Sequence, residues 1–387
     1  MGSAFPSGER KLWPRRGGII KKSSSFTSPG SLSEKCSGAL PLDLFDLASY
    51  DYLLPEELIA QNPAEPRDSS RLMVLSREKK EILHGTFGSL GAFLDEGDLL
   101  VLNDTRVIPA RLFGSKTTGG GRVEILLLRA LDSAFLEWEA LVKPGRKNPP
   151  GTGISLADGT EIVVGARCEE GVRKVAFPAG TAVLPLLERI GETPLPPYIT
   201  SSSAPRSSYQ TVFARKDGSA AAPTASLHFT PGLLGELQRE RGVRLGWLTL
   251  HVGLGTFRPV KSGDIREHKI HEEYCFLPAE TRELILETKG RGRKVIAAGT
   301  TVARTLESLA FEDGSLGSGE RMTRLFIYPG YRFKIIDGLI TNFHLPKSSL
   351  LMLVAAFAGY EFTMRAYEEA VSRRYRFFSF GDAMFIR

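Results

Sequence analysis

Cysteine and long apolar runs are scarce in this sequence of 387 residues, and each shortage excludes a class of protein. The three cysteines, Cys36, Cys168 and Cys275, stand far apart and form no CxxC pair, so neither a disulfide framework nor a cysteine zinc site is predicted. The longest strongly apolar run, Leu350 to Gly359, has ten residues, short of the ~20 that a membrane-spanning helix needs. We therefore expect a protein of a reducing compartment, without a membrane span.

Acidic residues are scarce in the first 40 residues, which contain seven Lys or Arg and two Asp or Glu. This segment carries +5 of the net charge of +6, so the basic character of the chain is no evidence that its folded part binds nucleic acid. The segment is rich in Ser and Gly and has no hydrophobic periodicity, and we expect residues 1–43 to form a flexible extension. Its composition is also typical of an organellar transit peptide or of a translation start placed upstream of the real one.

The spacing of apolar residues predicts an α/β fold. Strands are predicted at 98–103, 244–252, 294–298, 324–328 and 335–343, and helices at 55–61, 230–242, 279–289, 301–310, 346–358 and 361–375. Strands that alternate with helices are typical of a mainly parallel sheet with helices on both faces.

A different pattern interrupts this alternation. Apolar runs at 122–129 and 134–143, and again at 161–167 and 172–177, are separated by polar turns and predict antiparallel hairpins. Several short hairpins in sequence are typical of a small β-barrel. We therefore predict a discontinuous α/β domain, residues 44–107 and 181–387, with a β-barrel domain inserted at 108–180.

Three histidines follow predicted strands or precede a predicted helix, where the ligand of an open α/β sheet usually lies. His228 lies in AAPTASLHF (221–229), His251 in LHVGLGTF (250–257) and His344 in TNFHLPKSS (341–349). An imidazole titrates near neutrality and can act as an acid or a base. A lone histidine is more often a hydrogen-bonded structural residue, so position alone does not establish catalysis.

Other polar or flexible residues accompany these histidines. Gly253 and Gly255 would let a ligand approach the backbone, but the third glycine of a dinucleotide fingerprint is missing and a tight turn explains them equally well. Asn342 can donate and accept hydrogen bonds. Thr300 and Arg304 lie at the start of a predicted helix, where capping alone would account for the threonine.

Metal binding is not expected. His268 and His271 are three residues apart, but the pattern is not HExxH and no third ligand is evident.

Basic residues gather in two segments in or beside the predicted barrel. Arg106 and Arg111 flank a strand end, and Lys143, Arg146 and Lys147 lie on one predicted turn. Such groups can neutralise phosphates, although solvated loops have the same composition.

Taken together, ten segments resemble the S-adenosylmethionine:tRNA ribosyltransferase-isomerase family of queuosine biosynthesis. They are PEELIAQ (55–61), NDTRVIPARLFG (103–114), PLPPYI (194–199), YQTVFA (209–214), AAPTASLHF (221–229), TLHVGLGTFRPV (249–260), EHKIHEE (267–273), IYPGYRFK (327–334), TNFHLPKSSLLMLV (341–354) and YRFFSFGDAMFI (375–386). The resemblance runs from about Leu44 to the C-terminus.

The resemblance implies an α/β domain with an inserted β-barrel and an unusual transfer reaction. S-adenosylmethionine would donate its ribosyl group to the aminomethyl group of 7-aminomethyl-7-deazaguanine at the wobble position of a tRNA, giving epoxyqueuosine, adenine and methionine. No metal or further cofactor is implied. A cytoplasmic monomer is expected.

Within this resemblance, the reaction suggests roles for the residues above. A base must remove a proton beside the sulfonium and the departing adenine must be protonated, so His228, His251 and His344 are the candidate catalytic residues. The expected S-adenosylmethionine-binding residues are Thr224, Gly253, Gly255, Thr256, Thr300, Arg304 and Asn342. The expected tRNA-binding residues are Arg106, Arg111, Lys143, Arg146, Lys147, Tyr198 and Tyr331.

The sequence departs from the family pattern at several positions. Ser226 replaces the glycine of AAPTAGLHF, Val302 and Ala303 replace Ser and Val, and Ser349 replaces Thr. Serine at 226 would resist a backbone conformation that only glycine adopts easily. The rival functions are a tRNA methyltransferase, which should contain a glycine-rich loop near its first strand, and a tRNA-binding module without catalysis.

Overall fold

The computed structural model describes residues 42–168, 171–253, 260 and 262–387. The chain divides into two units, residues 1–42 and 43–387, and every helix and strand named below belongs to the second.

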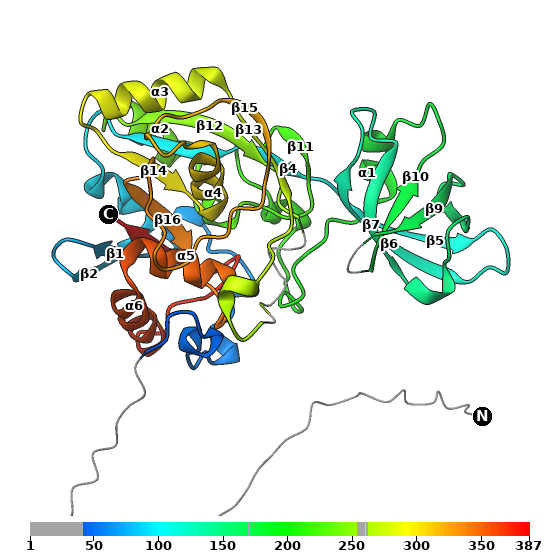
Figure 1. Ribbon diagram of the computed structural model, residues 1–387, viewed down its shortest axis with the longest axis horizontal. Helices are drawn as coiled ribbons and strands as arrows, with labels where there is room; N and C mark the ends of the chain where they lie inside the picture. Colours follow the sequence, from blue (N-terminus) through cyan, green and yellow to red (C-terminus); the bar gives the residue numbers. More distant parts are fainter. Residues whose placement is uncertain (1–41, 169–170, 254–259, 261) are drawn as a thin grey trace, which may run out of the picture. The chain divides into compact units, whose positions relative to one another are not determined.

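A nine-stranded mixed sheet forms the centre of the α/β domain (Figure 1). Its order is β15-β13-β12-β3-β14-β16-β17-β1-β2, and the central neighbours β12-β3-β14-β16 are parallel, as are β17 and β1. The other neighbours are antiparallel. The bounds are β1 Arg71–Ser76, β2 Glu81–Thr86, β3 Leu99–Asn103, β12 Arg244–Leu250, β13 Glu273–Leu277, β14 Val295–Ala298, β15 Gly319–Thr323, β16 Gly338–Asn342 and β17 Ala383–Ile386.

Apolar side chains cover both faces of this sheet. In β3, Leu99 and Val101 enter one hydrophobic cluster, whereas Leu100 and Leu102 enter another on the opposite face. This is why the strand reads as a continuous apolar run: both of its faces are buried. The covering helices are α2 Pro231–Arg239, α3 Ala279–Gly290, α4 Thr300–Leu309, α5 Ser349–Ala358 and α6 Tyr360–Ser372. The predicted fold class is confirmed.

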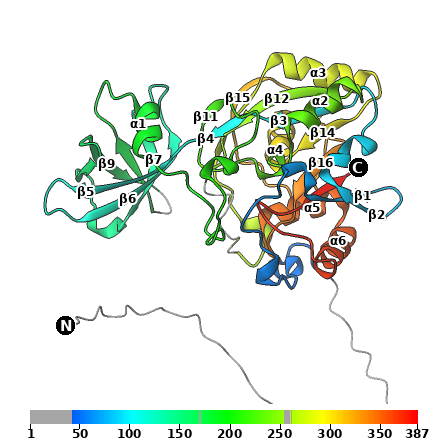
Figure 2. The ribbon, with the colours of Figure 1, turned by 180° about the vertical axis from the view of Figure 1, so that it is seen from behind.

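Six antiparallel strands close into the predicted barrel, in the order β10-β7-β6-β5-β8-β9 (Figure 2, from behind). Their bounds are β5 Arg111–Lys116, β6 Arg122–Ala130, β7 Glu137–Lys143, β8 Gly153–Leu156, β9 Glu161–Arg167 and β10 Val172–Ala176. Helix α1, Val183–Ile190, contributes Leu186 and Leu187 to the barrel core around Trp138. A two-stranded parallel ribbon pairs β4 Thr105–Val107, which precedes the barrel in sequence, with β11 Lys216–Ser219, which follows it.

Two predicted elements differ from the structure. The strand predicted at 324–328 is wrong, because the edge strand β15 ends at Thr323, whose hydroxyl accepts a hydrogen bond from the Leu325 N–H at 3.2 Å. The helix predicted at 55–61 is a single 3₁₀ turn, Glu56–Leu58.

In the described part of the chain no helix is long and apolar enough to cross a bilayer.

Candidate active site

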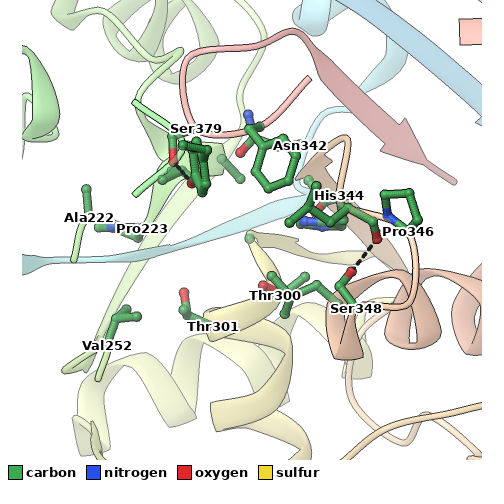
Figure 3. A pocket seen from close by; sticks show the side chains of 18 of the residues that line it. Ala222, Pro223, Val252, Thr300, Thr301, Asn342, His344, Pro346, Ser348 and Ser379 are labelled. Atoms are coloured by element: carbon green, nitrogen blue, oxygen red, sulfur yellow. Dashed lines mark hydrogen bonds between the residues drawn. The ribbon is translucent and has the colours of Figure 1, made fainter. Parts of the chain in front are cut away.

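A cavity of about 470 Å³ lies beyond the carboxyl ends of β12, β14 and β16 (Figure 3). Its walls come from residues 197–198, 222–225, 252, 299–301, 341–342, 344–348, 350 and 378–379. Gly299 and Thr300 follow β14 directly and Asn342 ends β16, so two neighbouring parallel strands place the polar residues Thr300 and Asn342 at one edge. This is where an open α/β sheet usually binds its ligand.

Helix α4 begins at this cavity without a capping side chain. Gly299 has a positive φ of 111°, which glycine adopts without strain, and no side chain caps the helix. The N–H groups of Thr300, Thr301 and Val302 therefore have no acceptor among the described residues. A free helix N-terminus attracts negatively charged groups.

Asn342 lines the cavity and is held from behind by His228. Its amide nitrogen lies 3.1 Å from His228 Nε2, while its oxygen is buried and has no hydrogen-bond partner among the described residues. His228 Nδ1 lies 2.7 Å from the Ser70 hydroxyl, so both ring nitrogens are occupied. Burial, and secondarily the charges of Arg376 and Arg67, lower the pKa of His228 to about 3. His228 is thus a neutral ring behind the cavity wall, not a residue that lines the cavity.

His344 does line the cavity (Figure 3). Its Nε2 lies 2.8 Å from the Thr341 hydroxyl, and Nδ1 has no partner in the described part of the chain. The backbone is fixed on both sides, since the His344 N–H donates to the Tyr367 hydroxyl and its carbonyl accepts from the Tyr52 hydroxyl. Burial lowers the pKa of the imidazole to about 3, so the ring is neutral at physiological pH.

His251 is not among the lining residues, although its neighbour Val252 is. Its Nδ1 lies 2.8 Å from the Thr105 hydroxyl, and its ring stacks on Tyr274 with centroids 5.4 Å apart. Burial lowers its pKa to about 4, opposed by the charge of Asp104. The three predicted histidines therefore occupy different environments, and only His344 faces the cavity.

Two residues in left-handed backbone conformation form part of the wall. Lys347 has φ 58° and Phe378 has φ 71°, values that side-chain-bearing residues adopt at a cost. Lys347 forms an ion pair with Asp51 at 2.6 Å. The Phe378 ring packs against Tyr198 with centroids 4.3 Å apart, and the Tyr198 hydroxyl lies 2.6 Å from that of Ser379. Tyr198, which was predicted to contact tRNA, lines the cavity.

Arg304, which was predicted to bind the donor, does not line the cavity. It is 5% exposed, forms an ion pair with Glu273 and donates from Nε to the Leu325 carbonyl at 3.1 Å. Glu273 also accepts from the Gly253 N–H at 3.0 Å. Arg304 therefore braces α4 against β13 and does not line the cavity.

Of the other predicted donor-binding residues, Thr224, Thr300 and Asn342 line the cavity. Gly253 is described but is not in the wall, and Gly255 and Thr256 lie outside the described residues. Ser226 needs no glycine conformation: it ends a 3₁₀ turn without a positive φ, and its hydroxyl donates to the Ala298 carbonyl at 3.2 Å.

The predicted tRNA-binding cations fall into two groups. Arg106 pairs with Glu188 and Asp217, and Arg111 lies 3.5 Å from Glu124. Lys143, Arg146 and Lys147 are exposed, and the structure pairs none of them with a described carboxylate.

Tyr331 is held by contacts outside the cavity. Its hydroxyl donates to Glu307 at 3.2 Å and its ring packs on Phe333, beside the main hydrophobic cluster. It is not a wall residue of the cavity.

Ser70, Phe378 and Ser379 were not among the site residues predicted from the sequence. Phe378 and Ser379 lie inside the segment YRFFSFGDAMFI, which was noted only for its resemblance. Ser70 gave no signal, because its contact with His228 spans 158 residues. Among the described residues no group of three His, Cys, Asp or Glu side chains is arranged to hold a metal ion.

A profile of the family described as "Queuosine biosynthesis protein" matches residues 47–386. The chain belongs to this family. It is 53% identical over 345 residues to the S-adenosylmethionine:tRNA ribosyltransferase-isomerase of Pelotomaculum thermopropionicum, covering 88% of this chain and 99% of that protein. It is 55% identical over 343 residues to the enzyme of the same name from Carboxydothermus hydrogenoformans, again covering 88% and 99%.

Among solved structures, the chain is similar to the S-adenosylmethionine tRNA ribosyltransferase of Thermotoga maritima. The identity is 40%, the TM-score is 0.50, and the match covers 88% of this chain and 100% of that one. The resemblance of the ten segments to the S-adenosylmethionine:tRNA ribosyltransferase-isomerase family of queuosine biosynthesis is confirmed.

Proposed function

We propose that this queuosine biosynthesis protein is an S-adenosylmethionine:tRNA ribosyltransferase-isomerase. It transfers the ribosyl group of S-adenosylmethionine to 7-aminomethyl-7-deazaguanine in a tRNA anticodon and releases adenine and methionine. The observation that carries the proposal is the cavity beside β14 and β16, where a free helix N-terminus, an unpaired amide oxygen and a neutral histidine meet. The proposed reaction uses no metal and no additional cofactor.

S-adenosylmethionine has groups that match this cavity. Its volume of about 470 Å³ falls within the range of ~300 to 1,000 Å³ that is common for small-molecule sites. The donor carboxylate would bind the free N–H groups of Thr300 and Thr301, since a helix N-terminus favours an anion. The adenine would lie against the aromatic wall of Tyr198 and Phe378.

His344 is the proposed proton acceptor. The sulfonium acidifies the neighbouring ribose 5′ carbon, and a base at that position must be unprotonated to remove the proton. His344 meets this condition because burial keeps its ring neutral and its Nδ1 has no partner in the described part of the chain. We place His228 and His251 outside direct proton transfer, because neither lines the cavity.

The deciding experiment uses S-adenosylmethionine labelled separately in the methyl and ribosyl groups. Incubated with tRNA that carries 7-aminomethyl-7-deazaguanine, the protein should move ribosyl label to the tRNA and release free adenine. Methyl label on the tRNA would identify a methyltransferase instead. Binding of the tRNA without release of adenine would identify a binding module.

The exposed turn of Lys143, Arg146 and Lys147 is the proposed tRNA-binding surface. Replacing all three by Gln should weaken tRNA binding and flatten the plot of log affinity against log salt, because each true phosphate contact contributes ~0.7 to 0.9 to its slope. The measurement is tRNA affinity at several salt concentrations. The affinity for S-adenosylmethionine should not change.

A matched triple replacement of exposed cations elsewhere provides the control. Lys79, Arg239 and Arg291 are exposed, and changing them to Gln removes the same formal charge. This variant should keep the wild-type slope. Equal slopes for the two triple variants would contradict a contact at the turn.

A further inference from the structure

The buried oxygen of Asn342 is the strongest unexplained feature of the cavity. Asn342 is 2% exposed, and its oxygen has no hydrogen-bond partner among the described residues. A buried polar atom without a partner is costly, and in a ligand cavity it marks a position that the ligand fills. Figure 3 shows this amide at the end of β16, with its oxygen turned toward the other lining side chains.

The orientation of the amide follows from the ring behind it. The Asn342 nitrogen can only donate a hydrogen bond, so His228 Nε2, at 3.1 Å, must accept it. A neutral imidazole carries one proton, which therefore lies on Nδ1 and is donated to the Ser70 hydroxyl at 2.7 Å. In this arrangement the Ser70 hydroxyl supplies the acceptor for the Nδ1 proton, and this tautomer keeps the Asn342 oxygen turned toward the cavity.

The three residues are firmly held. The Ser70 carbonyl accepts from the Phe87 N–H at 2.7 Å, and the Phe87 ring packs on the His228 ring with centroids 4.9 Å apart. Burial lowers the pKa of His228 to about 3, so the ring does not gain a second proton near neutral pH. A protonated ring would lose the acceptor that the amide needs.

We propose that Ser70, His228 and Asn342 form a positioning relay that selects adenine by accepting a hydrogen bond from its exocyclic 6-amino group. This inference deepens the proposed function and rests on it. The aromatic wall supports adenine as the partner: the Phe378 N–H donates to the carbonyl of Phe343, the residue after Asn342, at 3.0 Å. A flat base against Phe378 and Tyr198 would therefore present its edge beside the Asn342 oxygen.

The test compares S-adenosylmethionine with its analogue in which hypoxanthine replaces adenine. The analogue carries an oxygen at position 6, which would face the Asn342 oxygen without a hydrogen bond. Wild-type protein should prefer the natural donor in kcat/KM by about 10- to 100-fold, the range expected when buried polar groups lose their pairing. Release of adenine or hypoxanthine, dependent on modified tRNA, is the readout.

Three variants separate the relay from a general loss of activity. Ser70→Ala removes the acceptor of the Nδ1 proton, so the opposite tautomer and the reversed amide become accessible, and the preference should fall about tenfold or more. Asn342→Leu should abolish it. Asn342→Asp keeps an acceptor at the cavity and should retain the preference, even where kcat falls.

Thr288→Val is the matched control. Thr288 is fully buried near the end of α3, and its hydroxyl donates to the Leu284 carbonyl at 2.7 Å, so the variant loses a buried hydroxyl outside the cavity. It should keep the wild-type preference. The relay would be overturned if wild-type protein used both donors equally, or if Ser70→Ala kept the wild-type preference. If Ser70→Ala does not fold, the wild-type preference and the comparison of Asn342→Leu with Asn342→Asp decide the question. Absence of ribosyl transfer in wild-type protein would instead overturn the proposed function.

Discussion

Replacing His344 by Gln is expected to lower turnover by about 10²- to 10⁴-fold, the range typical for loss of a general acid or base. Among the three predicted histidines, His344 is the one that lines the cavity, and its Nδ1 has no partner among the described residues. Glutamine can still reach the Thr341 hydroxyl but cannot accept a proton from carbon. The measurement is single-turnover release of adenine with saturating S-adenosylmethionine and modified tRNA.

The affinity for S-adenosylmethionine and for tRNA should change little in this variant, which separates catalysis from folding. His84→Gln provides the control, because His84 lies on the edge strand β2 with Tyr375 and Glu369 and is not a wall residue. It should retain wild-type turnover. A His344→Gln variant that turns over normally would move the base to another group.

The four central strands β12, β3, β14 and β16 were predictable because their signals are local, whereas β1, β2, β13 and β17 were not predicted. The strands β3 and β14 are short apolar runs with both faces buried. Helix α2, predicted from residue 230, begins at Pro231, and the Thr230 hydroxyl caps it by accepting from the Leu233 N–H. The edge strand β15 was not, because its residues are mostly polar and its structure depends on pairing with β13 across more than 40 residues. Such a strand leaves no periodic pattern.

The candidate site was only partly predictable for a similar reason. The position after a strand correctly indicated Asn342, His344 and Thr300 as cavity residues. It did not distinguish His344 from His228, since both lie near such positions and only their partners differ. Arg304 was selected because it lies one turn into the helix that follows a strand. Its ion pair with Glu273 was not predictable, because Glu273 is distant in sequence.

The buried histidines His228 and His344 should also lower the stability of the folded protein at acid pH. The pKa of both His228 and His344 is lowered by burial from about 6.5, the value of the unfolded chain, to about 3. Below pH 6.5 the unfolded state therefore binds protons that the folded state does not. Above pH 6.5 both rings are neutral in the folded and the unfolded state, and they do not lower the free energy of unfolding. As the pH falls from 6.5 to about 3, the free energy of unfolding decreases progressively.

Each of these two histidines should lower the free energy of unfolding by about 1.4 kcal/mol per pH unit in that range, so the pair contributes about 2 to 3 kcal/mol between pH 6 and pH 5. This is a large part of the ~5 to 15 kcal/mol that stabilises a typical domain.

Other groups also titrate, so the measurement compares two proteins. Denaturant unfolding is measured at pH 6 and at pH 5 for wild-type protein and for the double variant His228→Gln/His344→Gln. The double variant should be less stable at pH 7 but should lose less stability on acidification, because glutamine binds no proton. Parallel losses in the two proteins would show that these rings are protonated in the folded state, and the tautomer argument for Asn342 would then fail as well.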